Sequence, residues 1–151
     1  MGLKRLAGSG DRIRLVVLPV LVVGVVLNVM VPEVFAVGGP PGWLAVLSAV
    51  VLVPGIVAWL WSVALILRHV PRGELITGGP FAVVTHPLYT AVALLVLPWA
   101  GFLLDTWLGV VLGLVLYAAS RRFAPAEERV LATVFPGEWE RYRDGVLIPW
   151  L

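Results

Sequence analysis

The 151-residue sequence contains no cysteine, only two histidines and few charged side chains. The absence of cysteine excludes disulfides, thiol nucleophiles and thiolate metal ligands, and two histidines are too few for an ordinary zinc site. We therefore expect no metal. The eleven Lys and Arg residues are scattered, with no basic stretch interleaved with aromatics, so we expect no nucleic-acid partner either.

The sequence is instead rich in hydrophobic residues, which form long apolar segments. Hydrophobic residues make up 60% of the chain and charged residues 13%, and the mean hydropathy is +1.00. These values predict an integral membrane protein, with membrane lipids as its surroundings. A helix needs about 20 residues to cross a bilayer. Apolar segments of suitable or slightly smaller size cover residues 13–31, 43–67, 87–104 and 106–120.

These segments predict an all-α, polytopic membrane protein with about four transmembrane helices, folded as a single domain over residues 1–151. With four spans, every Lys and Arg falls on one side of the membrane, whereas the opposite loops carry only Glu33 and Asp105 as charged groups. Positive charge collects on the cytoplasmic side of membrane proteins. We therefore expect both termini to be cytoplasmic, in a bacterial or archaeal cytoplasmic membrane.

The last two apolar segments are joined by little more than Leu104-Asp105-Thr106, which predicts an antiparallel helical hairpin. The polar segments 68–86 and 121–151 then lie near each other on one face of the membrane. In the second of these, Pro125 suits a first helical position and Pro136-Gly137 ends a helix. The pattern therefore predicts a separate cytoplasmic helix over Pro125–Phe135.

One carboxylate on this predicted helix is unusually placed. Glu127 falls near the centre of the apolar stripe at helical spacing, and Glu128 falls at its edge. The stripe comprises Val130, Leu131, Val134 and Phe135. A carboxylate on an apolar face calls for a polar or cationic partner. The alternative is that Glu127 merely occupies a first helical turn, where the helix dipole favours acids, and the sequence leaves both interpretations open.

The stretch "THPLY" (85–89) stands at the threshold of the third apolar segment. Taken alone it is typical of a helix entrance, with His86 ahead of the helix, Pro87 in its first turn and Tyr89 in an interfacial aromatic belt. The preceding Gly78-Gly79-Pro80 predicts a bend that returns the chain to the membrane. Arg121 and Arg122 fit the positive-inside pattern.

The ordered combination is more specific than any of its parts. Gly-Pro-aromatic, His-Pro-x-Tyr, a membrane hairpin, Glu-Glu and then "VFPGEWERYRDGVLIPW" (134–150) follow one another between residues 75 and 151. This order resembles the isoprenylcysteine carboxyl methyltransferase family and its phospholipid methyltransferase relatives. The resemblance implies an enzyme that transfers a methyl group from S-adenosylmethionine, without a metal, to a lipophilic acceptor from the bilayer. The acceptor would be a prenylcysteine-like carboxylate or a lipid.

The resemblance also implies a set of site residues, although it assigns no catalytic group. The implied cofactor contacts are Leu75, Ile76, Phe81, His86, Pro87, Leu88, Tyr89, Glu127 and Glu128. Arg122 is implied as a substrate contact. Tyr142 and Pro149 match the closing segment of the family, which we expect to cap the pocket.

Two positions depart from the family pattern, because Thr85 and Phe123 stand where family members usually have arginine. The second departure argues against an isoprenylcysteine carboxylate as the acceptor. A carboxylate needs no general base, whereas an amine must lose a proton, for which His86 or a glutamate would be the candidate. The sequence offers no clear base, which favours an acceptor that is already nucleophilic. Two other functions stay open: an NADPH-dependent membrane reductase of the sterol-reductase type, and a non-enzymatic membrane protein that retains the fold.

Overall fold

The computed structural model describes residues 3–39, 41–149 and 151, and within this part the chain is helical with no β-strand. This confirms the all-α prediction. The helices are α1 (Leu3–Met30), α2 (Pro32–Phe35), α3 (Gly42–His69), the 3-10 turn η1 (Val70–Arg72), α4 (Pro80–Val83), α5 (Pro87–Thr90), the π-helix η2 (Ala91–Val96), α6 (Leu97–Leu103), α7 (Leu108–Val134) and α8 (Glu138–Gly145).

Three of the described helices are long and apolar enough to cross a membrane, over Gly10–Met30, Gly42–Arg72 and Leu108–Val134. The stretch Pro87–Leu103, predicted as the third of four spans, is apolar but shorter than these. At 1.5 Å per residue it reaches about 25 Å, less than the thickness of a bilayer core. The described part of the chain therefore has three helices of full spanning length and one shorter apolar stretch.

The prediction that a helix ends near residue 120 and a new one begins at Pro125 is wrong. α7 continues through Pro125 to Val134 as one helix. A single proline removes one main-chain donor, and here the flanking Ala124 is buried and Phe123 packs into the core, which holds the helix together. The helix does end just ahead of Pro136-Gly137, as the sequence indicates, and α8 follows as an element that the sequence did not reveal.

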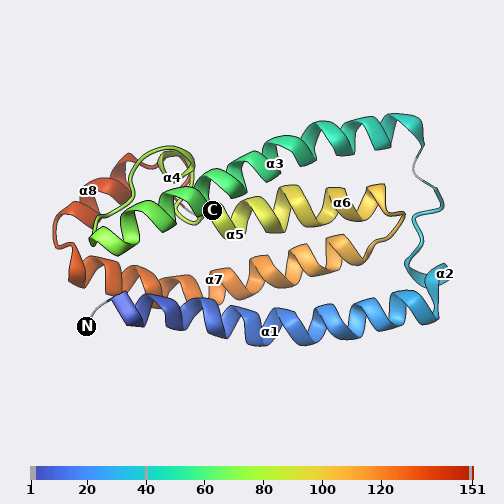
Figure 1. Ribbon diagram of the computed structural model, residues 1–151, viewed down its shortest axis with the longest axis horizontal. Coiled ribbons are helices and arrows are strands. Elements are labelled where there is room, and N and C mark those ends of the chain that lie inside the picture. The colour runs from blue at the N-terminus through green and yellow to red at the C-terminus, as the bar shows by residue number, and fades with distance from the viewer. Residues whose placement is uncertain (1–2, 40, 150) are drawn as a thin grey trace.

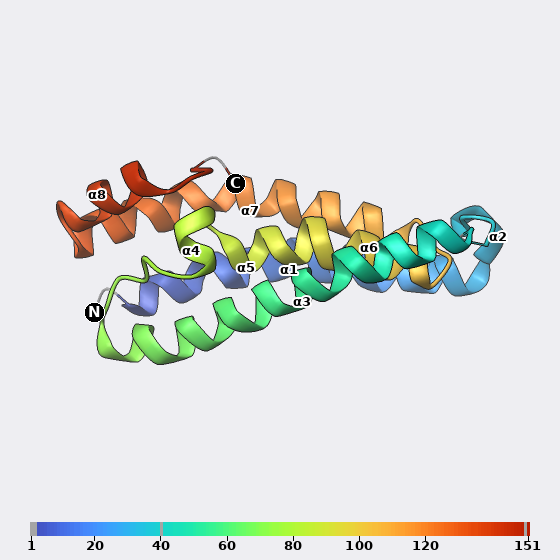
Figure 2. The ribbon, with the colours of Figure 1, turned by 90° about the horizontal axis from the view of Figure 1, so that it is seen from above.

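The long helices form one bundle in which α5, η2 and α6 lie between α3 and α7, while α1 runs along α7 (Figure 1). α6 and α7 form the predicted antiparallel hairpin. Figure 2 shows α3 and α7 separating toward the end of the bundle that carries α4 and α8. The site described below lies at this open end.

Small residues allow the helices to approach closely, as is usual in membrane proteins. Gly109 and Gly113, one turn apart on α7, face α6 and η2, and a Cβ atom on either would meet the main-chain oxygen of Leu97 or Ala93. On α3, a Cβ on Gly55 would lie 2.6 Å from the Cβ of Leu95. The stretch formed by η2 and α6 therefore packs between two helix faces that carry glycine, one on α7 and one on α3.

The opposite end of the bundle is tied by Asp105. This residue has a left-handed φ of 55°, and its Oδ1 accepts hydrogen bonds from the main-chain nitrogens of Val37 (3.1 Å) and Gly39 (2.9 Å). Next to it, Thr106 Oγ1 donates a 2.6 Å bond to Asn28 Oδ1 on α1. These contacts join the α6–α7 turn to the connection between α1 and α3.

Candidate functional site

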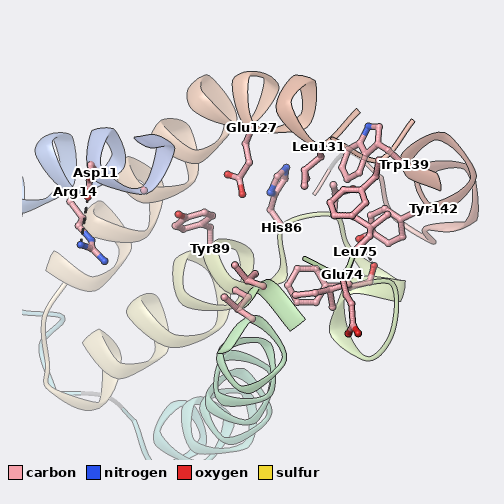
Figure 3. A pocket seen from close by; sticks show the side chains of 17 residues that line it. Asp11, Arg14, Glu74, Leu75, His86, Tyr89, Glu127, Leu131, Trp139 and Tyr142 are labelled. Carbon is pink, nitrogen blue, oxygen red and sulfur yellow. Dashed lines mark hydrogen bonds and ion pairs between the residues drawn. The ribbon is translucent and has the colours of Figure 1, made fainter. Parts of the chain in front are cut away.

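A cavity of about 430 Å³ lies at the open end of the bundle (Figure 3). Segments far apart in the sequence contribute to its wall: the first turns of α1 after residue 9, the end of α3, the 73–79 loop, α4, α5, α7 and α8. The lining residues are Gly10, Asp11, Arg14, Ile66, Val70, Glu74, Leu75, Ile76, Phe81, Thr85, His86, Tyr89, Glu127, Leu131, Phe135, Trp139 and Tyr142.

The structure brings most of the residues implied by the resemblance to this one cavity. Six of the nine implied cofactor contacts line it: Leu75, Ile76, Phe81, His86, Tyr89 and Glu127. Pro87 is instead buried at the first position of α5, and Leu88 follows it in the same turn, away from the lining. Glu128 is also absent from the lining, but its side chain bonds to a residue of the lining.

That residue is His86, which precedes α5 as its N-cap. Its Nε2 lies 3.1 Å from Oε1 of Glu128 on α7, although 42 residues separate the two in the sequence. The histidine side chain is 14% exposed and the glutamate side chain 32%. A charge-assisted hydrogen bond with this degree of shielding is stronger than a neutral one at the surface. It connects the His-Pro-x-Tyr and Glu-Glu motifs directly.

Glu127 extends into the cavity, with its carboxylate directed toward the space between Tyr89 and His86 (Figure 3). The interpretation of Glu127 as a residue of a first helical turn is wrong, because α7 begins at Leu108. Its neighbour Leu131, one turn further along, lines the same cavity. The carboxylate therefore stands on a cavity-facing side of α7 that is otherwise apolar.

The wall opposite this carboxylate is an apolar cluster built from α4, the 73–79 loop and α8. Trp139, Tyr142 and Val146 are buried, and Leu75 and Phe81 pack against them. The Tyr142 hydroxyl donates a 2.7 Å hydrogen bond to the main-chain oxygen of Phe81. Burial raises the pKa of Tyr142 to about 12, so this hydroxyl stays protonated and remains a donor.

The segment after α8, which the resemblance implies as a cap of the pocket, lies against the end of α4 and the residues that follow it. The main-chain nitrogen of Ile148 donates a 2.8 Å bond to the oxygen of Val83, beside a single bridge between Val84 and Ile148. Thr85, which replaces the expected arginine, is buried, and its hydroxyl donates a 3.2 Å bond to the oxygen of Pro149. A short hydroxyl at this position thus anchors the closing segment.

Phe123 stands at the second position where the family usually has arginine. Phe123 and its neighbour Arg122 both lie outside the cavity lining. Phe123 packs against the core formed by α1 and α7. Arg122 is exposed, with its guanidinium carbon 6.0 Å from the centre of the Phe123 ring, and it is absent from the lining. Among the described residues, the arginine that lines the cavity is Arg14 on α1.

The contribution of α1 was not found from the sequence. Gly10, Asp11 and Arg14 line the cavity, and Arg14 Nη1 lies 3.7 Å from Asp11 Oδ1. One signal was present, because Asp11 is the only acid in the basic stretch ahead of the first apolar segment. An acid three residues before an arginine is also an ordinary helix-surface pair, so this signal alone could not indicate a site.

The described residues contain no group of three or more His, Asp or Glu side chains that could hold a metal ion. No protein-family model, curated protein or solved structure matches the chain significantly. Fold and site together define a helical protein with membrane-length apolar helices and a cavity, at one end of the bundle, that combines carboxylates, a histidine and an apolar wall.

Proposed function

We propose that the protein is a membrane methyltransferase that uses S-adenosylmethionine and acts on a lipophilic acceptor. The observation that carries this proposal is the convergence of Leu75, Ile76, Phe81, His86, Tyr89 and Glu127 on one cavity. These residues come from two motifs separated by the α6–α7 hairpin. Their order in the sequence suggested the family, and their meeting in space is a property that the sequence pattern did not require.

The residues of the cavity fit such a cofactor. Its volume of about 430 Å³ lies within the range of about 300–1,000 Å³ found for small-molecule sites. Apolar side chains of Leu75, Ile76 and Phe81 suit an adenine ring, and the carboxylates of Glu74 and Glu127 suit ammonium, sulfonium or hydroxyl groups. Two kinds of wall are therefore available for a ligand that is part aromatic and part charged.

When bound, S-adenosylmethionine supplies a methyl group on a positively charged sulfur. The chain itself would align the reactants and exclude water. Glu127 would hold the charged part of the cofactor, and the apolar wall would orient its ring. The closing segment after α8, bonded to Val83 and Thr85, would keep bulk water away.

The membrane arrangement is part of the proposal. With the short Pro87–Leu103 stretch crossing beside α7, the chain has four spans and both termini on the cytoplasmic side, where the cavity would receive a water-borne cofactor. The exposed apolar faces of α1 and α3 suit contact with lipid tails. The acceptor, a lipid or a prenylated compound, would reach the same cavity from the bilayer.

Calorimetry on the full chain in detergent tests this function, with S-adenosylhomocysteine and S-adenosylmethionine as ligands. We expect binding by the parent protein and at least a tenfold weaker affinity in Glu127→Gln, because a charged contact is lost. Glu140→Gln, an exposed change on α8, is the matched control and should bind like the parent. Absence of binding to either ligand would refute the proposal.

NADPH in the same titration separates the alternatives. Binding of NADPH with no response to the two S-adenosyl compounds would indicate a reductase. Binding of S-adenosylmethionine without methylation of any component of an added membrane lipid extract would indicate a protein that retains the site without turnover. The methyltransferase predicts both binding and incorporation of the labelled methyl group into a lipid fraction.

A further inference from the structure

The two ring nitrogens of His86 have different surroundings. Nε2 is engaged by Oε1 of Glu128 at 3.1 Å, and the residue as a whole lines the cavity. No other hydrogen bond of the His86 ring is formed within the described part of the chain. Nδ1 is therefore the nitrogen that remains available to a ligand.

The bond to Glu128 determines which nitrogen carries the proton in the neutral ring. An ionised carboxylate can only accept hydrogen bonds, and a glutamate is ionised at neutral pH in its ordinary state. The positive charges of Arg121 and Arg143 also act on the Glu128 carboxylate. Nε2 must then be the donor, which leaves Nδ1 with a lone pair that can accept a proton.

We propose that His86 is the general base of the reaction, that Glu128 is the positioning residue that holds its tautomer, and that the acceptor is a nucleophile that must lose a proton, such as an amine. This inference rests on the proposed methyltransferase function. It chooses among the candidate bases that the sequence offered, His86 or a glutamate, because the two residues of the pair are adjacent only in the folded chain.

The other charged groups around His86 favour this class of acceptor over a carboxylate. Among the described residues, the cavity is faced by the acidic side chains of Asp11, Glu74 and Glu127, by the phenol of Tyr89 and by the guanidinium of Arg14. Arg14 is paired with Asp11, and Glu74 Oε2 lies 4.0 Å from Nε2 of His69. Outside the lining, Arg121 and Arg143 act on the Glu128 carboxylate. Acids outnumber arginines among the described residues of the lining, which favours an ammonium group over an anion. A carboxylate acceptor, moreover, would have no use for a base.

The acceptor, an ammonium on arrival, gives one proton to Nδ1 of His86 and so exposes its lone pair. That lone pair forms the bond to the methyl carbon of the sulfonium donor while the methyl–sulfur bond breaks, and the bonding electrons stay on sulfur. The products are a methylated ammonium, whose nitrogen now carries the positive charge that was on sulfur, and a neutral thioether, and the imidazolium returns its proton to water. Glu128 remains ionised throughout.

The second histidine of the chain provides an internal reference for the tautomer. His69 Nδ1 lies 3.0 Å from the main-chain oxygen of Leu65, and a carbonyl oxygen only accepts, so the neutral His69 ring carries its proton on Nδ1. The nearest carboxylate oxygen to its Nε2, Oε2 of Glu74, lies at 4.0 Å, beyond hydrogen-bond distance. The two histidines should therefore be opposite tautomers. Nitrogen-15 spectra of the full chain in detergent at neutral pH measure this directly, with His69→Gln identifying the signals.

We expect a protonated Nε2 in His86 and a protonated Nδ1 in His69. Glu128→Gln should abolish the preference of His86 and leave His69 unchanged, whereas Glu127→Gln, the adjacent glutamate, should leave both tautomers as they are. A His86 protonated on Nδ1, or a tautomer indifferent to Glu128→Gln, would overturn the positioning role. This measurement needs no cofactor and stands even where methyl transfer fails.

Methyl transfer tests the base and the acceptor class, with a long-chain primary amine and a long-chain carboxylate as probes. General-base catalysis contributes about 100- to 10,000-fold. We therefore expect methylation of the amine to fall at least 100-fold in His86→Gln and about tenfold or more in Glu128→Gln, with a smaller change in the affinity for S-adenosylhomocysteine.

The outcomes separate the two proposals. A protein that does not bind S-adenosylhomocysteine refutes the methyltransferase itself. A protein that binds it but methylates the carboxylate in preference to the amine, methylates neither, or keeps its amine rate in both His86→Gln and Glu128→Gln refutes the assignment of the base and acceptor. Glu128→Gln keeps the test decisive where His86→Gln fails to fold.

Discussion

The hydroxyl of Tyr142 on α8 donates a 2.7 Å hydrogen bond to the main-chain oxygen of Phe81 on α4, across 61 positions of sequence. Both side chains line the cavity, so this one bond joins two walls of the site. The phenol is 8% exposed, which means that water cannot readily replace the bond when it is lost. The bond therefore contributes both to the fold and to the shape of the cavity.

Replacement of this hydroxyl should loosen α8. Tyr142→Phe keeps the ring and leaves the Phe81 oxygen without its donor, so we expect a loss of about 1–2 kcal/mol in the free energy of unfolding. Denaturant unfolding in a fixed detergent, followed by tryptophan fluorescence, measures it. Tyr117→Phe is the control, because the Tyr117 ring packs in the core between α1 and α7, far from α8. Equal losses in both variants would contradict the role given to the bond.

The same phenol predicts how stability depends on alkaline pH. Burial raises the pKa of Tyr142 from 10.0 to about 12, which means that the fold favours the protonated form. The resulting stabilisation is complete below about pH 10 and is lost as the pH rises toward about 12, to a maximum of about 2.7 kcal/mol for a two-unit difference.

Unfolding measured across that alkaline range should therefore show a steeper loss of stability for the parent than for Tyr142→Phe. The two curves should converge near pH 12, apart from the contribution of other groups that both proteins share. Parallel curves at all pH values would mean that the phenol ionises as readily in the folded state as in the unfolded chain.

Close helix packing at Gly109 gives a third prediction. A Cβ atom there would meet the main-chain oxygen of Leu97 and would lie 2.9 Å from the Cα of Gly101. Gly109→Ala should therefore push α7 from α6 and cost about 1–3 kcal/mol, seen as a lower midpoint of thermal unfolding. At Gly145, on α8, a Cβ would meet nothing within 4 Å. Gly145→Ala should be neutral or slightly stabilising, and a similar loss at both positions would argue against the close contact.

The tie at Asp105 should affect stability without affecting the site. Asp105→Ala removes the acceptor of two main-chain bonds and places a less suitable residue at a left-handed φ, so we expect a loss of about 2 kcal/mol. Asp105→Asn keeps an acceptor oxygen and tolerates this backbone conformation, and should lose less than half as much. Calorimetry with S-adenosylhomocysteine should give the same affinity for both variants, since the turn lies at the end of the bundle away from α8 (Figure 1). A weaker affinity would show coupling between the ends.

Helix limits set by local chemistry were predictable. The segment 43–67 appears as Gly42–His69, and the third segment begins at Pro87 as the His-Pro pair indicates. The end of α7 just before Pro136-Gly137 was also predictable, because these residues disfavour continuation of any helix. Pro125 led to a wrong prediction of a helix start, because tertiary packing here overrides the local preference. The packing of Phe123 and the burial of Ala124 outweigh one lost main-chain hydrogen bond.

The residues of the candidate site were also predictable only in part. The order of the motifs was enough to identify Phe81, His86 and Glu127 as candidates, since an ordered set of residue types is visible in the sequence itself. It could not reveal Asp11 or Arg14, because their part in the cavity follows from the packing of α1 along α7. Helical spacing separated the two glutamates, with Glu127 nearer the centre of the apolar stripe, but it could not reveal that Glu127 faces this cavity and that Glu128 bonds to His86.

Composition and apolar length by themselves determined that this is a helical protein suited to a membrane, because so apolar a chain can satisfy its main-chain groups in lipid only within helices. Local signals determined where several of those helices begin and end. Tertiary structure alone decided that α7 runs unbroken through Pro125, that Thr85 anchors the closing segment, and that His86 meets Glu128. These outcomes depend on contacts between residues far apart in the sequence, or on packing strong enough to override a local preference. No single stretch of the sequence specifies either of these.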